Sequence, residues 1–292
     1  MAPTAPARIA EFSRAGFTFD VIDEGPLDGD PVILLHGFPE RASSWSAVAA
    51  ILHGAGLRTL AVDQRGYSPR ARPKRVRDYR TTELADDVAA LAELLHEQTG
   101  RRPHLVGHDW GSAVAWTLVL RHPDAVRSLT AVSVPHPGAF LRSEFTSTQF
   151  LKSWYFLPFT APYVTTFASR RPKLVDPMLR RFGMTAEEVA RFHTGIVEYG
   201  VLPYGLNWYR AMVLTDRELM KQPVRVPTTL VWSDGDVAVG RAGVEGTAAT
   251  MAPGTDYRLV VLEGVTHWIP TQAPQPLAEA ILDRVERVAA DR

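Results

Sequence analysis

The stretch Leu105-Val106-Gly107-His108-Asp109-Trp110-Gly111-Ser112 decides how this chain folds. Its first residues end a short apolar run that is typical of a buried strand. Residues 112–121 are apolar nearly all round, as expected of a helix that packs on the middle of a sheet. Small residues stand on both sides of the connection, at Gly107 and Gly111. The stretch therefore predicts a sharp strand–turn–helix that projects its central side chain, Asp109, above the sheet.

The composition indicates a folded globular protein, and its neutral charge favours chemistry on small molecules. Of the 292 residues, 46% are hydrophobic and 22% are charged. The 32 basic and 32 acidic residues cancel, so no net field attracts nucleic acid or an anionic membrane, and we interpret the basic stretch 65–80 as a solvated loop. The chain has no cysteine, which excludes disulfides and thiol nucleophiles. It has no secretion signal and no run of about 18 apolar residues, so a cytoplasmic location is expected.

Strands and helices alternate along both ends of the chain. Strands are expected at 9–13, 17–24, 32–35, 59–62, 105–106, 129–134, 229–232 and 257–262. Helices are expected at 44–53, 81–98, 112–121, near 242–251 and around 277–288. The first two strands flank Ala15-Gly16 as a hairpin would. This order predicts an α/β fold with a mostly parallel central sheet flanked by helices.

The alternation stops between His136 and Gln222. That stretch is rich in aromatic residues and proline, and it indicates helices, one of which begins at a capping box formed by Thr185 and Glu188. We therefore predict a core made of residues 1–135 and 223–292, with residues 136–222 inserted as a helical cap.

Asp109 has three interpretations when it is taken alone. It fits a nucleophile elbow, an ordinary helix-capping aspartate, or a glycine loop for phosphate, although a carboxylate would repel a phosphate. Asp236 follows a late predicted strand and His267 follows the last one, so the chain order is nucleophile, acid, base. Singly, such residues are more often turn formers or structural histidines. Three matches at three strand ends favour a catalytic set, with Asp234 as a rival for the acid.

The strand at 32–35 runs directly into His36-Gly37-Phe38-Pro39. In hydrolases with a nucleophile elbow, a backbone N–H at this place and the N–H after the nucleophile form the oxyanion hole. We therefore expect the amides of Phe38 and Trp110 to serve that role. A plain turn explains the first motif equally well by itself.

Together these features resemble an α/β-hydrolase-fold epoxide hydrolase of the bacterial, cap-bearing type, over nearly the full length. The motifs are His36-Gly-Phe-Pro-Glu40, Asp63-Gln-Arg-Gly-Tyr-Ser68, Gly107-His-Asp-Trp-Gly-Ser112, Val134-Pro-His-Pro137, Ser153-Trp-Tyr155, Asn207-Trp-Tyr-Arg210, Asp236 and His267. The resemblance implies that Tyr155 and Tyr209 are cap tyrosines that protonate the opening epoxide, and its spacing selects Asp236 as the acid. For both tyrosines, aromatic packing is the alternative role.

An aspartate nucleophile restricts the substrate class. A carboxylate attacks a strained or activated sp³ carbon to give an ester, whereas acyl transfer would give a labile anhydride, so epoxides and alkyl halides remain. His267, oriented by Asp236, would deprotonate the water that clears the ester. An epoxide needs an acid, which a tyrosine of pKa about 10 supplies at neutral pH. A halide needs only N–H donors, and the Trp110 indole is one.

We thus predict a cofactor-independent epoxide hydrolase, with a haloalkane dehalogenase and a non-catalytic ligand-binding homologue as alternatives. The substrate-binding residues are expected to suit an apolar or aryl epoxide, and they are Phe38, Trp110, Trp154, Trp208 and Phe159. The histidines lack metal-ligand spacing, so we expect no metal and no organic cofactor. We expect no nucleic-acid or membrane partner, and a monomer or homodimer.

Overall fold

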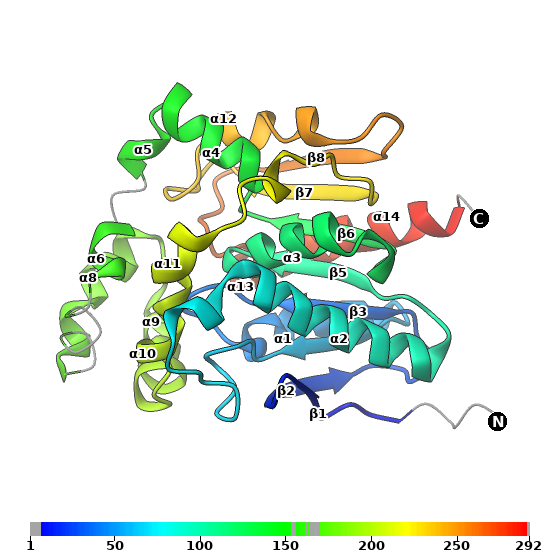
Figure 1. Cartoon of the computed structure of the whole chain (residues 1–292), viewed down its shortest axis with the longest axis horizontal. Coiled ribbons are helices and arrows are strands. Elements are labelled where there is room, and N and C mark those ends of the chain that lie inside the picture. Colours follow the sequence, from blue (N-terminus) through cyan, green and yellow to red (C-terminus); the bar gives the residue numbers. More distant parts are fainter. Residues whose placement is uncertain (1–6, 153–155, 162, 164–166, 168–169, 291–292) are drawn as a thin grey trace.

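The computed structural model describes residues 7–152, 156–161, 163, 167 and 170–290. These residues form one eight-stranded sheet, in which the strand order is β1-β2-β4-β3-β5-β6-β7-β8 (Figure 1). The strands are β1 (Glu11–Arg14), β2 (Phe17–Glu24), β3 (Pro31–Leu35), β4 (Arg58–Val62), β5 (His104–His108), β6 (Ser128–Val132), β7 (Thr228–Ser233) and β8 (Tyr257–Leu262). The pairs β1–β2 and β2–β4 are antiparallel, and the remaining pairs are parallel. The predicted hairpin and mostly parallel sheet are therefore confirmed.

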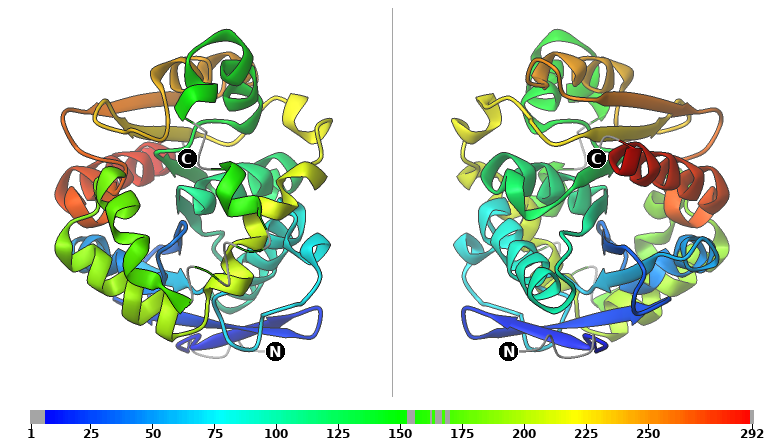
Figure 2. Two further views of the ribbon diagram at one scale, coloured as in Figure 1. Left: turned by 90° about the vertical axis from the view of Figure 1, so that its left-hand side faces the viewer. Right: turned by 90° about the vertical axis from the view of Figure 1, so that its right-hand side faces the viewer.

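The sheet is covered on both faces. The flanking helices are α1 (Ser46–Gly54), α2 (Thr81–Thr99), α3 (Trp110–Arg121), α12 (Arg241–Glu245), α13 (Ile269–Gln272) and α14 (Pro274–Ala290). Helices α1 and α14 lie on one face, and α2 and α3 lie on the other (Figure 2). The central strands β3 to β7 are buried at every residue, which explains their continuous apolar runs.

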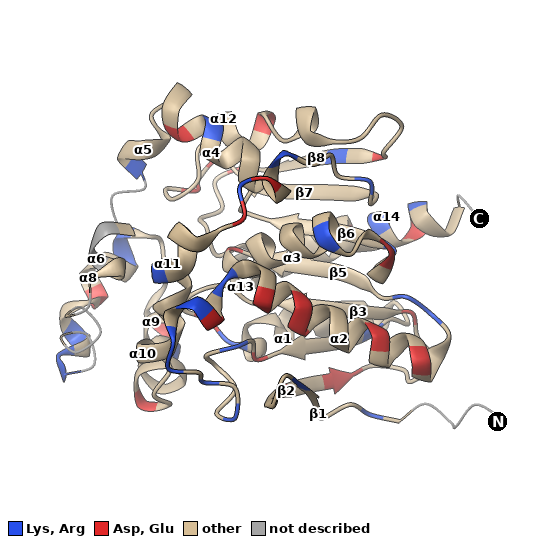
Figure 3. Cartoon of the chain, viewed as in Figure 1, with Lys and Arg blue, Asp and Glu red and all other residues tan. Residues whose placement is uncertain are grey.

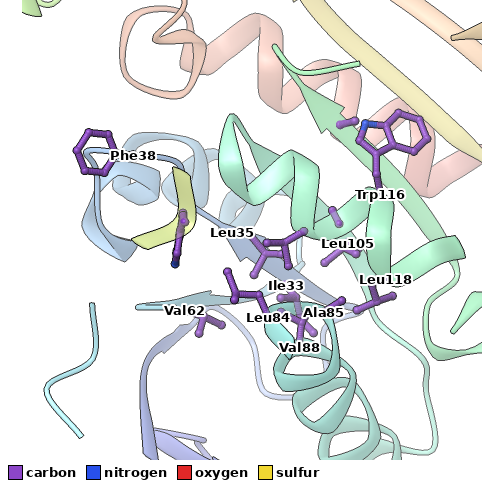
Figure 4. Packing of buried hydrophobic residues seen from close by; sticks show 14 of the residues in the cluster. Ile33, Leu35, Phe38, Val62, Leu84, Ala85, Val88, Leu105, Trp116 and Leu118 are labelled. Carbon is purple, nitrogen blue, oxygen red and sulfur yellow. The ribbon is translucent and has the colours of Figure 1, made fainter. Parts of the chain in front are cut away.

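Successive residues of β3 show how one strand serves two cores. Ile33 and Leu35 pack in the cluster that contains α2 and α3, whereas Val32 and Leu34 pack in the cluster that contains α1 and α14. Figure 4 shows the first of these clusters, with side chains of α2 and α3 meeting those of β3 and β5. This packing fixes the ends of β3 and β5, where two of the predicted site loops begin.

The described part of residues 136–222 consists of short helices joined by turns and irregular segments. The helices are α4 (Pro137–Thr146), α5 (Gln149–Lys152), α6 (Phe156–Thr160), α8 (Asp176–Arg181), α9 (Ala186–Phe192), α10 (Leu202–Gly205) and α11 (Asn207–Ala211). The predicted capping box at α9 is confirmed, since Thr185 and Glu188 exchange both hydrogen bonds. Many of their apolar side chains, including Leu179, Phe192 and Trp208, belong to the same buried cluster as the sheet.

Short helical turns complete the structure, and one of them alters a prediction. The 3₁₀ turns are Ala42–Trp45, Val76–Tyr79, Pro123–Ala125, Pro172–Leu174, Met212–Leu214, Leu219–Lys221 and Ala248–Thr250, and a π-helical turn spans His193–Glu198. The helix expected near 242–251 is shorter than predicted. It ends at Glu245 and continues only as the turn at 248–250, because Gly243 and Gly246 favour helix weakly.

Charged residues of both signs are interspersed along the fold (Figure 3). In the basic stretch 65–80, Arg65 and Arg80 pair with acidic side chains of α2, and Arg70 pairs with one of β1. These pairs place an acidic side chain beside three of the seven basic residues of the stretch, and Arg65 is buried rather than solvated. Within the described part of the chain, no helix combines the length and the apolar character that crossing a bilayer requires.

Candidate active site

Asp109 alone connects β5 to α3. Its backbone has φ 51° and ψ −117°, a conformation that non-glycine residues rarely adopt and that costs free energy. Its N–H donates to the carbonyl oxygen of Val132 at 3.2 Å, and its carbonyl oxygen accepts from Ala113 at 3.1 Å. The side chain makes no capping hydrogen bond to α3, which argues against the helix-capping interpretation. The carboxylate is thus held at the end of the sheet by a strained turn.

Two glycines allow β5, β3 and α3 to approach each other at this turn. A Cβ atom added at Gly107 would lie 2.3 Å from the carbonyl oxygen of Gly111, and one added at Gly111 would lie 2.2 Å from that of Leu35. Real Cβ atoms do not approach backbone oxygens so closely. The sequence requires glycine at both positions for steric reasons.

We therefore expect Gly111→Ala to lower the free energy of unfolding by roughly 2–4 kcal/mol, because backbone must move to admit the methyl group. Urea unfolding followed by circular dichroism measures this. The matched control is Gly54→Ala at the end of α1, where no atom lies within 4 Å of the added Cβ and stability should hold or rise. Equal stability of the two variants would contradict the steric account.

His267 lies between two carboxylates. Its Nε2 is 3.3 Å from Asp109 Oδ2, and its Nδ1 is 2.7 Å from Asp236 Oδ2. His267 and Asp236 are both buried, at 4% and 2% exposure. The three residues predicted at three strand ends, Asp109, Asp236 and His267, therefore lie in contact.

The loop after β7 decides which of its two aspartates reaches His267. Asp236 Oδ1 accepts hydrogen bonds from the N–H groups of Ala238 at 2.7 Å and Val239 at 2.9 Å, which leaves Oδ2 for the imidazole. Asp234 instead accepts from the N–H of Gly264 at 2.7 Å. The geometry favours Asp236 over its rival.

The electrostatics of the three groups are coupled. Burial by itself would raise the pKa of Asp109, but the hydrogen bond and positive charge of His267 outweigh burial and hold that pKa below its usual value. Burial would lower the pKa of His267, but the charge of Asp236 and the hydrogen bonds to both carboxylates raise it to about 10. These shifts favour a protonated His267 beside a negatively charged Asp109.

Backbone amides also interact with the carboxylate of Asp109. The N–H of Phe38 donates to Asp109 Oδ1 at 2.9 Å, and the N–H of Trp110 also lowers the pKa of Asp109. Gly37 makes the approach possible, because a Cβ there would lie 2.4 Å from the Cβ of Asp109. The two amides predicted from the sequence therefore both interact with the carboxylate of Asp109.

Aromatic rings enclose the same place. The ring of Tyr209 lies 5.4 Å from that of Phe38, 5.0 Å from that of Trp110 and 5.0 Å from that of Phe159, measured between centroids. Four of the predicted aromatic residues therefore come together. Trp208 contacts one of these rings, that of Trp110, at 6.0 Å between centroids. It also packs against the ring of His36, and its indole N–H donates to the carbonyl oxygen of Arg65 at 2.9 Å. Trp154 and Tyr155 lie outside the described residues.

Two cavities meet at Asp109. The larger has a volume of about 340 Å³ and is mainly apolar, with Trp110 and Tyr209 beside the carboxylate. Its other walls are Thr81, Ala113, Thr117, Val134, Pro137, Phe140, Leu141, Glu144, Phe156, Met212, Thr215, Arg217, Met220 and Val239. The smaller, about 40 Å³, adjoins His267 and Phe159. Trp208 lines neither cavity, so its predicted contact with substrate is not supported by the structure.

Two residues that no sequence motif singled out hold the backbone of His267. His108 Nε2 lies 2.9 Å from the carbonyl oxygen of His267, and Ser133 Oγ donates to that oxygen at 3.0 Å. His108 Nδ1 lies 3.4 Å from Glu40 Oε2, at the end of the motif after β3. The available signal was their position at strand ends beside the elbow.

Known proteins share this fold and sequence. Residues 30–274 match the alpha/beta hydrolase fold family. The AB hydrolase superfamily protein YfhM of Bacillus subtilis is 32% identical over 92% of this chain and 94% of its own length. Epoxide hydrolase 2 of Caenorhabditis elegans is 30% identical over 87% of this chain and 73% of its own length.

A solved structure agrees with these relatives. Epoxide hydrolase A from Mycobacterium thermoresistibile has a TM-score of 0.80 to this structure at 26% identity, covering 94% of this chain and 97% of that one. The resemblance inferred from the sequence motifs is therefore confirmed. This chain belongs to the alpha/beta hydrolase fold family, and epoxide hydrolases are among its relatives.

Proposed function

We propose that this protein is an epoxide hydrolase, which opens an epoxide to a vicinal diol through an ester on Asp109. The observation that carries the proposal is a carboxylate, Asp109, placed at a nucleophile elbow within reach of His267 and open to an apolar cavity. The names of the relatives support the same reaction. In this proposal Asp109, Asp236 and His267 form the catalytic triad.

The first step forms the ester. Asp109 Oδ2 attacks an epoxide carbon, the C–O bond of the ring breaks, and the oxygen takes a proton from a tyrosine hydroxyl. Tyr209 is suited to this role because it lines both cavities beside Asp109. Tyr155 remains the predicted second donor. The Phe38 amide keeps Asp109 Oδ1 as the carbonyl oxygen of the new ester.

The second step hydrolyses the ester. Alkylation removes the negative charge of Asp109, so one of the groups that raise the pKa of His267 is lost. The imidazolium of His267 then donates its proton to the tyrosinate and becomes neutral, so it can act as a base. Neutral His267 takes a proton from water as the water oxygen attacks the carbonyl carbon of the ester. The amides of Phe38 and Trp110 stabilise the negative charge that develops on Oδ1. Collapse breaks the bond between the carbonyl carbon and the ester oxygen, and the leaving alkoxide takes the second proton of the attacking water. The diol is released, Asp109 is a carboxylate again, and His267 is protonated again.

Oxygen-18 labelling tests this route. A single turnover in ¹⁸O-water should place label in the peptide that contains Asp109 and leave the diol unlabelled, because water attacks the carbonyl carbon of the ester and not its alkyl carbon. Label in the diol alone would reject the ester. Release of halide from a bromoalkane, without diol formation from any epoxide, would support a dehalogenase instead.

We expect Tyr209→Phe to slow ester formation about 10²-fold, because the variant keeps the ring packing but loses the proton donor. Rapid-quench kinetics with mass spectrometry of the enzyme follows this step directly. Tyr163→Phe is the matched control, since Tyr163 is 84% exposed. An unchanged rate in Tyr209→Phe would assign Tyr209 to packing only.

The larger cavity supports an apolar or aryl epoxide as substrate. Its walls include Phe140, Met212 and Met220, and few charged groups reach it. We expect styrene oxide to have a kcat/KM on the order of tenfold above that of glycidol, because burial of the aryl ring contributes binding that a hydroxymethyl group lacks. A steady-state comparison of the two epoxides decides this, and equal values would contradict it.

The segment 136–222 is proposed to act as the cap, over a core of residues 1–135 and 223–292. The support is that it supplies Phe156, Phe159 and Tyr209 to a site whose other groups lie on loops after β3, β5, β7 and β8. Trp154, which the sequence predicts to bind substrate, also belongs to this segment. The oligomeric state and the compartment stay predictions.

A further inference from the structure

Helix α5, from the segment 136–222, is bonded to the loop that carries Asp236. The side chain of Gln149 is buried at 2% exposure. Its Nε2 donates to the carbonyl oxygen of Ala238 at 2.9 Å, and its Oε1 accepts from the N–H of Gly240 at 2.7 Å. Lys152 Nζ donates to the carbonyl oxygen of Asp236 at 3.0 Å. Three hydrogen bonds therefore join α5 to residues 236–240.

One of these bonds acts on a peptide group that holds the Asp236 carboxylate. The C=O of Ala238 and the N–H of Val239 belong to the same planar peptide unit. Gln149 binds this unit at the carbonyl, and the unit donates its N–H to Asp236 Oδ1. A donor on the carbonyl side fixes the plane and polarises the unit, which strengthens the N–H as a donor.

The contact between α5 and the loop is closely fitted. A Cβ at Gly240 would lie 3.1 Å from Gln149 Oε1, so glycine lets the helix approach. The backbone N–H of Gln149 donates to Ser147 Oγ at 3.1 Å. From the core side, Trp232 Nε1 donates to the carbonyl oxygen of Val239 at 3.2 Å. The loop is thus held by β7 on one side and by α5 on the other.

We propose that Gln149 is a positioning residue for Asp236, which it orients toward His267 through the Ala238–Val239 peptide. The inference rests on the proposed function, in which Asp236 orients the base for ester hydrolysis. It links the segment that carries Tyr209 to the chemistry of the second step. Removal of the Gln149 amide should therefore slow ester hydrolysis while ester formation by Asp109 continues.

The kinetic test compares Gln149→Ala with Leu151→Ala, a change on the same helix at a side chain that is 60% exposed. In Gln149→Ala we expect kcat to fall about tenfold, as loss of a buried hydrogen bond implies. KM should fall with it because the ester accumulates, so kcat/KM stays within about twofold of wild type. Leu151→Ala should match wild type. A parallel fall of kcat and kcat/KM, or no change in either, would overturn the proposal.

A second measurement needs no substrate. The Nδ1–H proton of His267, bonded to Asp236 Oδ2 at 2.7 Å, should give a low-field ¹H NMR signal that His267→Gln removes. We expect Gln149→Ala to move this signal and Leu151→Ala to leave it in place. An unmoved signal would count against positioning by Gln149. A moved signal in a protein that forms neither ester nor diol would sustain the positioning role and reject the epoxide hydrolase function.

Discussion

Asp109→Asn should lower kcat/KM for epoxide hydrolysis by at least about 10⁴-fold, because the neutral amide cannot attack carbon. The side chain keeps its shape, and asparagine tolerates positive φ better than most residues, so the turn between β5 and α3 should survive. Mass spectrometry of the variant after mixing with an epoxide should detect no covalent adduct.

The matched control for this change is Asp234→Asn. Asp234 is the other carboxylate considered for the site, and it bonds the N–H of Gly264 away from His267. This variant should retain activity close to that of wild type. Turnover by Asp109→Asn within tenfold of wild type would remove Asp109 from the role of nucleophile.

His267→Gln should stop the reaction after the first step. Without the imidazole, no base activates water, so the ester persists and kcat falls by about 10⁴-fold. Intact-protein mass spectrometry should show one epoxide bound per chain. The positive charge that lowers the pKa of Asp109 is also lost, so burial should raise that pKa and ester formation should need a higher pH.

The control for the histidine change is His122→Gln, at a half-exposed residue that pairs with Asp86. Normal turnover is expected there. If His267→Gln is inactive and also fails to form the adduct at high pH, the assignment of His267 to ester hydrolysis is wrong.

The proximity of Asp109, Asp236 and His267 was predictable from sequence because the parallel strands end on the same side of the sheet. The carboxyl ends of β5, β7 and β8 lie at the same end of the sheet, so polar residues that follow these strands can meet although they are far apart in the chain. Asp109, Asp236 and His267 are each recognised by that position. The position of the Phe38 amide beside Asp109 follows from the same rule applied to β3.

Other features depend on contacts that no local pattern encodes. Trp208 and Tyr209 are neighbours in an aromatic segment, yet one ring packs behind the site and the other lines it, because successive residues of α11 point in different directions. Gln149 reaches Ala238 across 89 positions of sequence. A glutamine in a short helix of the segment 136–222 carries no sign of such a partner.

The buried cluster that contains both β-sheet and inserted side chains also bears on cooperativity. Leu179, Phe192 and Trp208 share one hydrophobic interior with Leu35 and Leu105. A hinge that lifted the whole insert as a rigid body would expose that interior to water, at about 25 cal/mol for each Å² of apolar surface. We therefore expect substrate to enter through side-chain rotation and local opening of the structure. We also expect the segment 136–222 and the sheet to unfold in one thermal transition.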